Sequence, residues 1–199
     1  MSDNNSTAGN NPIDAVILWV DGSDRALAEK RARYLALEKT ADAHPGAQPF
    51  RFASSGEIRY CIISILTFAR FIRNIYVVTD GQDPSLYEEI KSRFPDKAGC
   101  LKIIDHMEIF RDYEQHLPTF NSSSIHSMIW RIKGLSERFV YFNDDEILIR
   151  EMREEDWFIG DRPVLMGRWL LPPYRRYAIS KLKVLINRQA AWAMRCPSS

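Results

Sequence analysis

"IDAVILWVDGSD", residues 13–24, is the most informative segment of the sequence for the fold. It begins with a short apolar run, rich in β-branched residues, that is typical of a strand buried on both faces of a sheet. The Asp-Gly-Ser-Asp that follows is a turn signal, and Ser23 or Asp24 can cap a helix in the next residues. A strand, a tight turn and a helix in this order favour an α/β fold.

The same alternation continues along the chain. Helices are predicted over residues 24–39, 57–72, 84–94 and 121–132, and strands over residues 74–80, 101–105 and from Phe139 onward. Residues 40–56 lose all periodicity and are predicted to form a loop, as are residues 106–119 with one helical turn. This order indicates an α/β protein with a mostly parallel sheet and helices on both faces.

Length and charge pattern suggest how the chain is organised. Its 199 residues suffice for one α/β domain with a substantial core. We expect a disordered leader over residues 1–12, the α/β domain over residues 13–150, and a partial C-terminal extension over residues 151–199. No acidic residue follows Asp161, so the extension is basic. Within it we predict a strand at 163–167 and a basic helix at about 177–194, which resembles a membrane-surface helix or a domain helix that lacks its partner.

Composition excludes several classes of function. A net charge of +1 gives no electrostatic case for nucleic-acid binding. No run of 18 apolar residues is present to span a membrane, and the first residues lack the apolar core of a signal peptide, so we expect a cytoplasmic protein. Cys61, Cys100 and Cys196 lie far apart without a C-x-x-C spacing. They predict neither a disulfide framework nor a zinc site.

Each predicted strand ends in polar residues. These ends are Asp21-Gly22-Ser23-Asp24, Thr79-Asp80-Gly81-Gln82, Asp105-His106 and Asn143-Asp144-Asp145. In an open parallel sheet, ligands bind at the carboxyl ends of the strands. We therefore expect the four segments to converge on one edge of the sheet and to form a site there.

Asp144 and Asp145 interrupt the apolar run "FVYFNDDEILI", residues 139–149. Two neighbouring carboxylates repel each other unless they hold a cation, and hard oxygen ligands suit Mg²⁺ or Mn²⁺. The two residues are thus candidate metal ligands. Asn-Asp pairs are also frequent in hairpin turns, and the short pattern leaves both interpretations open.

The other candidates carry alternatives of the same kind. Residues 21–24, at a glycine turn before a helix, could seat a phosphate or nucleotide, or they could form an ordinary helix cap. Arg59 would suit a diphosphate if it faced the site, and is otherwise a solvated helix residue. His106 is either an acid–base group or a plain loop histidine, whereas His126, in a helix, is interpreted as structural.

Four segments resemble the first and second conserved regions of the Stealth family over about residues 12–149. They are "IDAVILWVDGSD", "GEIRYCIISILTFARFIRNIYVVTDGQ", "LPTFNSSSI" and "GLSERFVYFNDD". This family comprises bacterial capsular polysaccharide phosphotransferases and the animal enzyme that transfers N-acetylglucosamine 1-phosphate to lysosomal glycoproteins. The resemblance implies that residues 13–150 form a Rossmann-like or GT-A-like domain that binds a nucleotide-sugar.

The resemblance also implies a reaction. A hexose 1-phosphate or N-acetylhexosamine 1-phosphate would move from a UDP-sugar donor to a hydroxyl of a glycan acceptor, and the phosphodiester would belong to a capsular or surface polysaccharide. The bond between the two phosphates breaks, not the bond to the anomeric carbon. Mg²⁺ is the implied cofactor, with Mn²⁺ as the alternative, and the expected place is the inner face of the membrane, which the basic tail would contact through anionic lipids.

Residue roles follow from the same resemblance. Asp144 and Asp145 would hold the cation, and Arg59 would clamp phosphate oxygens. The turn Asp21-Gly22-Ser23-Asp24 would seat the nucleotide or its phosphates, with Asp80 and Asn121 at the same edge. Asp21, Arg59, Asp144 and Asp145 are accordingly the implied catalytic group, and no catalytic base is identified.

Several positions depart from the family pattern. Ile63 stands where a second arginine is common, Ser123 and His126 replace other polar residues, and Glu146 follows the two aspartates where an apolar residue is usual. Family members continue through a third and a fourth region that this sequence lacks, so we expect a truncated product or fragment. Two further interpretations are a GT-A-type glycosyltransferase, which binds its UDP-sugar through Mn²⁺, and a non-catalytic nucleotide-sugar-binding remnant.

Overall fold

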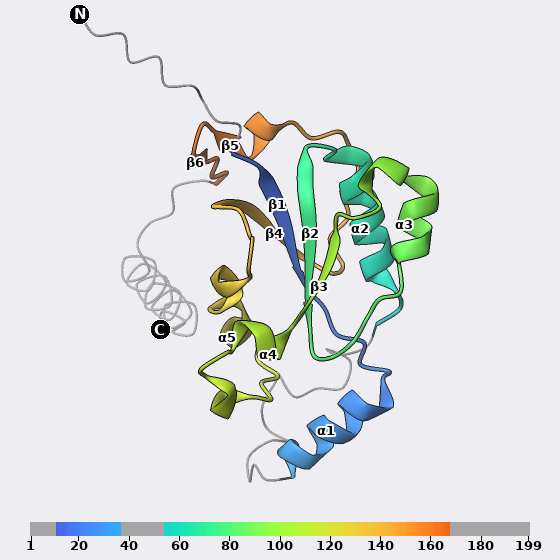
Figure 1. Ribbon diagram of the computed structural model, residues 1–199, viewed down its shortest axis with the longest axis vertical. Coiled ribbons are helices and arrows are strands. Elements are labelled where there is room, and N and C mark those ends of the chain that lie inside the picture. The colour runs from blue at the N-terminus through green and yellow to red at the C-terminus, as the bar shows by residue number, and fades with distance from the viewer. Residues whose placement is uncertain (1–10, 37–53, 168–199) are drawn as a thin grey trace, which may run out of the picture. The chain divides into compact units, whose positions relative to one another are not determined.

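A four-stranded parallel sheet forms the centre of the protein (Figure 1). The computed structural model describes residues 11–36 and 54–167. In spatial order the sheet contains β3 (Leu101–Asp105), β2 (Ile72–Thr79), β1 (Ile13–Leu18) and β4 (Arg138–Asn143), and each neighbouring pair is parallel. The two central strands are almost entirely buried, as the apolar runs in the sequence predict.

Helices cover both faces of this sheet. On one face Ile13, Ala15 and Ile17 pack in a cluster with residues of α2 (Glu57–Phe68) and α3 (Tyr87–Arg93). On the other face Val16 packs in a second cluster with residues of α4 (His106–Ile109), α5 (Ser122–His126) and the 3₁₀ helix η6 (Ile129–Arg131). The predicted α/β class, with a mostly parallel sheet and helices on both faces, is confirmed.

The remaining elements lie outside these two layers. α1 (Arg25–Leu35) extends beyond the carboxyl ends of the strands, and Leu27 is its buried residue (Figure 1). The 3₁₀ helices η4 (Pro95–Lys97), η5 (Glu114–His116) and η7 (Glu154–Asp156) join the larger elements. β5 (Phe158–Ile159) pairs antiparallel with β6 (Arg162–Pro163). Among the described helices none is long and apolar enough to cross a membrane.

Four predicted element boundaries were wrong. The helix expected over 121–132 is divided into α5 and η6, because the Ser127 hydroxyl donates to the carbonyl of Ser124 and competes with regular helix bonding. The helix expected over 57–72 stops at Phe68, since Ile72 already pairs with β1. The strand within 139–149 ends at Asn143, where Glu146 N–H closes a turn, and the strand expected at 163–167 covers only 162–163.

Some predictions lie largely or wholly outside the described residues. These are the leader, most of the 40–56 loop, and the basic helix at 177–194. The segment after β4 packs on the main core: the ring centroid of Trp157 lies 5.3 Å from that of Phe71 and 5.9 Å from that of Phe142. The domain boundaries expected at residues 12 and 150 stay predictions.

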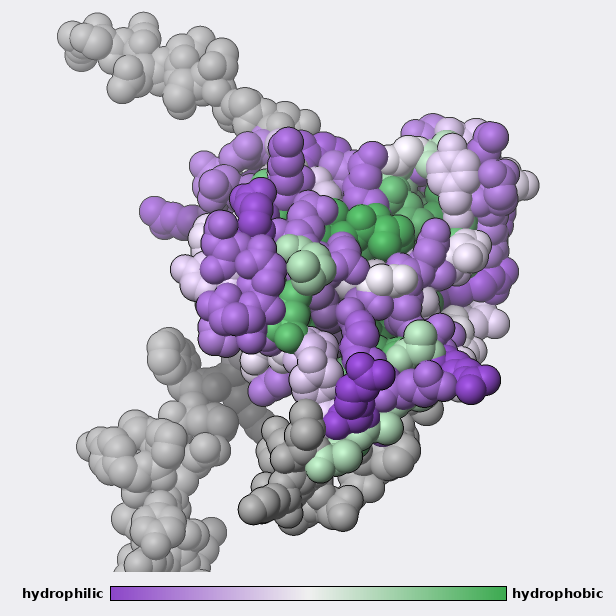
Figure 2. Space-filling model, turned by 60° about the horizontal axis from the view of Figure 1, so that its bottom comes forward, coloured by the Kyte–Doolittle hydropathy of each residue, from purple (hydrophilic) through white to green (hydrophobic). Residues whose placement is uncertain are grey.

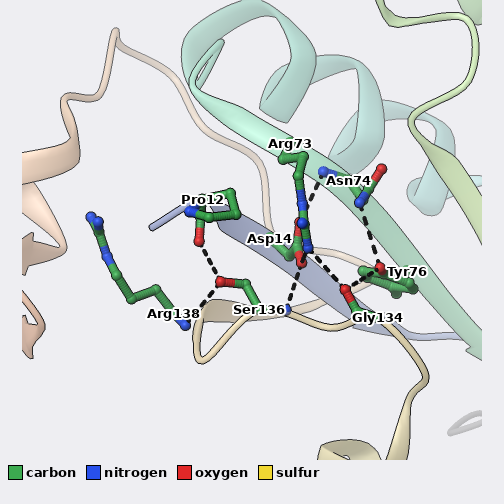
Figure 3. A network of polar contacts seen from close by, with 8 residues as sticks. All are labelled: Pro12, Asp14, Arg73, Asn74, Tyr76, Gly134, Ser136 and Arg138. Atoms are coloured by element: carbon green, nitrogen blue, oxygen red, sulfur yellow. Dashed lines mark hydrogen bonds and ion pairs between the residues drawn. The ribbon is translucent and has the colours of Figure 1, made fainter. Parts of the chain in front are cut away.

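A buried carboxylate joins the amino ends of three strands. Asp14 on β1 is 0% exposed, and its oxygens accept from Arg73 Nε (3.0 Å) and Nη2 (2.5 Å) and from the backbone N–H groups of Asn74 (3.1 Å) and Ser136 (2.8 Å). Arg73 also donates to the carbonyl of Gly134 at 2.9 Å (Figure 3). The carboxylate thereby links β1 to β2 and to the turn before β4.

Replacing this carboxylate should destabilise the fold strongly. Asp14→Ala would leave two buried N–H donors and a guanidinium edge without their acceptor, which should lower the free energy of unfolding by about 3–5 kcal/mol in urea denaturation. Asp96→Ala, at an exposed position in η4, is the control and should change it by less than about 0.5 kcal/mol. Equal effects of the two substitutions would contradict the structural role that we assign to Asp14.

Candidate functional site

The four polar strand ends converge on one edge of the sheet. In the strand register Leu18 lies opposite both Val78 and Asn143, and Thr79 lies opposite Asp105. The loops that follow these residues therefore start side by side, and Asp21 and Asp145 extend from neighbouring strands. With the bottom of Figure 1 turned forward, the surface is mostly hydrophilic with apolar patches between (Figure 2).

The loop after β1 is held by its own carboxylates and by the loop after β2. Asp21 Oδ1 accepts from the backbone N–H and the hydroxyl of Ser23, at 2.9 and 2.6 Å. The Gln82 side chain binds both backbone groups of the same residue: its Oε1 accepts from Asp21 N–H (2.8 Å), and its Nε2 donates to the Asp21 carbonyl (3.0 Å). Gln82 belongs to one of the four strand ends that were expected to converge, but no role was predicted for it; its position directly after the Asp-Gly turn was the available signal.

Asp24 forms the helix cap that was one of its two interpretations. Its Oδ1 accepts from Leu27 N–H at 2.7 Å, at the start of α1. From the same helix Lys30 forms an ion pair of 2.7 Å with Asp80, at the end of β2. The first two loops are thus joined by an ion pair as well as by Gln82.

His106 lies inside the protein and not in a loop. It begins α4, directly after Asp105, which caps that helix by accepting from Met107 N–H at 2.7 Å. Only 4% of His106 is exposed, and burial lowers the pKa of its imidazole despite the opposing influence of Asp80 and Asp105. A neutral, enclosed imidazole favours a packing role over direct contact with a substrate.

The turn after β4 carries negative charge that no basic side chain of the described residues pairs with. Asn143 is fixed by Glu146, whose carboxylate accepts from its Nδ2 (3.0 Å) and N–H (3.1 Å), and by the Tyr141 hydroxyl, which donates to its Oδ1 (3.1 Å). Within residues 11–36 and 54–167, neither Asp144 nor Asp145 forms an ion pair with a basic side chain. Asp144 is partly buried whereas Asp145 is exposed.

Electrostatics at this turn favour a cation. Burial, followed by repulsion from Asp145 and Glu57, raises the pKa of the Asp144 carboxyl above its usual range, although nearby backbone N–H groups oppose the shift. Burial and the neighbouring carboxylates also raise the pKa of the Cys61 thiol to about 12, and this thiol donates to the Asn143 carbonyl at 3.5 Å. A divalent cation would relieve the carboxylate repulsion.

The donor set at the turn is small. Across the described ranges, no group of three or more His, Cys, Asp or Glu side chains could hold a metal ion. Two carboxylates alone fit a cation that takes its other ligands from water or substrate, as Mg²⁺ commonly does. His126, from α5, packs its ring against Tyr141 with centroids 4.0 Å apart, in agreement with its predicted structural role.

A pocket of about 290 Å³ opens beside the Asp21 loop. It lies between that loop, the start of α2 and the loop before α3, and is lined by Trp19, Asp21, Ser54, Gly56, Ile58, Arg59, Asp83, Pro84 and Leu86. Arg59 therefore borders the pocket and is not simply a solvated helix residue. Asn121 caps α5 by accepting from Ser123 N–H at 2.9 Å, and it is not among the residues that line this pocket.

The first turns of α2 connect the pocket with the carboxylate turn. Glu57 is close enough to Asp144 to affect its protonation, Arg59 lines the pocket together with Asp21, and Cys61 bonds to Asn143. The first turns of this one helix thus face both the pocket and the turn that carries Asp144 and Asp145. Of the predicted site residues, the structure joins Asp21, Arg59 and the Asp144–Asp145 pair through this helix.

Neutralising Asp144 should stabilise the protein. Because its folded pKa is raised above the ordinary 3.8, the folded state binds this proton more tightly, and stability is lost as pH rises from that value through the folded pKa. Asp144→Asn should therefore raise the free energy of unfolding at about pH 7, with the gain shrinking toward about pH 4. Urea denaturation at both pH values measures this, with Asp161→Asn, at an exposed position near β6, as the control that should leave the stability unchanged at either pH. A less stable Asp144→Asn protein at neutral pH would contradict the assignment.

Comparisons with known proteins agree with this architecture. The family model described as Stealth protein CR2, conserved region 2, matches residues 51–164, and that of conserved region 1 matches residues 11–37. A Streptomyces coelicolor protein named exopolysaccharide phosphotransferase is 44% identical over 147 residues, which are 74% of this chain and 25% of that protein.

Two further relatives come from other bacteria. An exopolysaccharide phosphotransferase of Lactiplantibacillus plantarum is 39% identical over 155 residues, 78% of this chain and 42% of its own length. A capsular polysaccharide phosphotransferase of Actinobacillus pleuropneumoniae is 34% identical over 146 residues, 73% of this chain and 38% of its own length. The chain thus spans less than half of each of these relatives. Since conserved region 2 alone matches more than half of the chain, this protein belongs to the Stealth family.

Proposed function

We propose that this chain binds the donor in a reaction that transfers a hexose 1-phosphate or N-acetylhexosamine 1-phosphate from a UDP-sugar to a hydroxyl of a glycan. The product would be a phosphodiester in a capsular or surface polysaccharide. One observation carries the proposal: α2 connects the Arg59-lined pocket to a carboxylate pair, without a basic partner among the described residues, at the carboxyl edge of a parallel sheet. The names of the relatives support the same chemistry.

The chemistry defines what the site must supply. The acceptor oxygen forms a bond to the sugar-bearing phosphorus while the bond between the two phosphates breaks and UMP leaves. The proton of the acceptor hydroxyl passes to a base that the described residues do not identify. Negative charge builds up on the phosphate oxygens, so the protein has to stabilise it and to hold donor and acceptor in line.

The described residues can meet these needs from two directions. Asp144 and Asp145 would hold Mg²⁺, or Mn²⁺ as the alternative, and the cation would neutralise the diphosphate. Arg59 would bind phosphate oxygens from the pocket side. At about 290 Å³ the pocket is just smaller than the usual range for small-molecule sites, about 300–1,000 Å³, and we expect it to hold only part of the donor.

The other predicted donor contacts are more constrained. The carboxylates of Asp21, Asp24 and Asp80 already accept from Ser23, Leu27 and Lys30, so they would shape the loops in the ligand-free protein. The Gly22 and Ser23 segment is the part of this turn that we expect to approach the phosphates, and Asn121 stays a proposed contributor from α5.

Product analysis separates this proposal from the GT-A-type alternative. The turn of Asn143, Asp144 and Asp145 after a parallel strand would serve a Mn²⁺-dependent glycosyltransferase equally well. Incubation with a UDP-sugar labelled in both phosphates distinguishes the two. A phosphodiester that retains the sugar's phosphate, with release of UMP, supports the phosphotransferase; a glycosidic bond with release of UDP supports the alternative.

Asp145→Ala should abolish Mg²⁺-dependent binding of a UDP-sugar while leaving the fold intact, because the exposed Asp145 is proposed to hold the cation. Calorimetric titration with and without Mg²⁺ measures this, and Asp161→Ala, at an exposed acidic position near β6, is the control. A variant that binds as tightly as the parent would refute the metal assignment.

The same titration tests whether the chain is a non-catalytic remnant. Binding without turnover would favour the remnant, and a parent chain that does not bind at all would contradict both the phosphotransferase and the remnant interpretation.

The basic residues after Asp161 should bring the protein to anionic membrane surfaces at the cytoplasmic face, where we propose that it acts. Most of this segment lies outside the described residues. Co-sedimentation with liposomes should increase with the fraction of phosphatidylserine and fall as salt screens the attraction. Co-sedimentation that is insensitive to lipid charge would argue against this contact.

A further inference from the structure

Arg59 is held along one edge of its guanidinium by a carboxylate from another helix. Glu89, on α3, accepts from Arg59 Nε at 2.7 Å and from Nη2 at 2.5 Å. Arg93, one turn further along α3, donates Nη1 to the same carboxylate at 2.9 Å. Arg59 lines the pocket, whereas Glu89 is not among its lining residues.

We propose that Glu89 is a positioning residue of the donor site, one that fixes Arg59 so that its remaining guanidinium edge is presented to the donor diphosphate. This inference rests on the proposed function. A bidentate carboxylate occupies Nε and Nη2 and leaves Nη1 for a ligand. Since arginine has a long and flexible side chain, an edge that is already fixed loses less side-chain entropy when phosphate binds.

The charge of the cluster keeps it attractive to an anion. Two arginines share one glutamate, so Glu89 does not neutralise the group, and a net positive charge remains. The hydrogen bonds that Arg59 donates to Glu89 raise the pKa of its guanidinium, which keeps it charged, and the aromatic ring of Tyr60, with its centroid 5.4 Å from Cζ, stabilises the charge further. Arg59 is also the basic side chain among the residues that line the pocket, beside the carboxylates of Asp21 and Asp83.

A competing role for Glu89 predicts the opposite change in donor affinity when Glu89 is replaced. If Glu89 occupied the edge that phosphate needs, removing its charge would release Arg59 and strengthen binding. Positioning predicts weaker binding. Two features favour positioning: Nη1 is not among the atoms that Glu89 engages, and Arg93 holds Glu89 on α3 and thereby limits its movement with Arg59.

Calorimetric titration of the full chain with UDP in Mg²⁺ tests the proposal. Glu89→Gln should weaken binding roughly five- to tenfold, as expected for the loss of a charged positioning contact. Glu88→Gln removes the same charge from the neighbouring exposed position of α3 and should change the affinity by less than about twofold. Unchanged or tighter binding by Glu89→Gln would overturn the proposal.

A double-mutant cycle tests whether Glu89 acts through Arg59. In an Arg59→Ala background, Glu89→Gln should have no further effect on UDP affinity, within about twofold. An equal loss in both backgrounds would indicate a general structural role and overturn the proposal. Glu89→Asp, which keeps the charge but shortens the side chain, should restore part of the lost affinity.

A measurement without nucleotide separates this inference from the proposed function. In ¹⁵N NMR the Arg59 Nε–H signal should be resolved and slow to exchange in the parent and in Glu88→Gln, and lost in Glu89→Gln; a signal that is unaffected by Glu89→Gln would overturn the positioning role. If the parent does not bind UDP, the proposed function fails and the donor-site role of Glu89 fails with it. If the parent binds and Glu89→Gln binds equally well, only the role of Glu89 fails.

Discussion

The buried carboxylate of Asp14 is the constraint on which the candidate site depends, although it lies at the opposite end of the strands. Its four acceptor contacts tie β1 to β2 and to the turn before β4. A slip of one residue between these strands would turn every side chain to the other face and displace the loop by about 3.3 Å. The register that sets Leu18 against Val78 and Asn143 is therefore also the register that brings the polar loops together.

The edge that results is divided into two electrostatically different halves. On the β1–β2 side the two basic side chains are paired: Lys30 with Asp80, and Arg59 with Glu89. On the β4 side burial, and after it repulsion from Asp145 and Glu57, raises the pKa of Asp144, and no basic side chain among the described residues pairs with it. A folded protein tolerates such an arrangement where a ligand supplies the missing charge, and functional sites are where local rules of stability are commonly broken.

How much of the fold and of the candidate site could be predicted from the sequence depends on how far apart along the chain the interacting residues lie. Strand 101–105 and the parallel order follow from local hydrophobicity and alternation, and were predicted correctly. Asp14 and Glu89 were not selected, and Gln82 was given no role, because the function of each depends on a partner 30 to 122 residues away. The single helix expected over 121–132 failed for a local reason, since serine hydroxyls bond to the backbone and weaken a helix that the apolar spacing favours.

The two halves of the edge suit a ligand that carries both a cation and a diphosphate. A carboxylate pair alone attracts a divalent ion weakly in water, and a single guanidinium alone discriminates little between anions. A metal-bound diphosphate presents positive charge to Asp144 and Asp145 and phosphate oxygens to Arg59, so one ligand satisfies both halves at once. Because the cation and the phosphate oxygens belong to one bound complex, occupation of the carboxylate pair should favour occupation of the Arg59 pocket, and the reverse. Cation and nucleotide are then expected to bind cooperatively, as they would if the proposed donor bound as its magnesium complex.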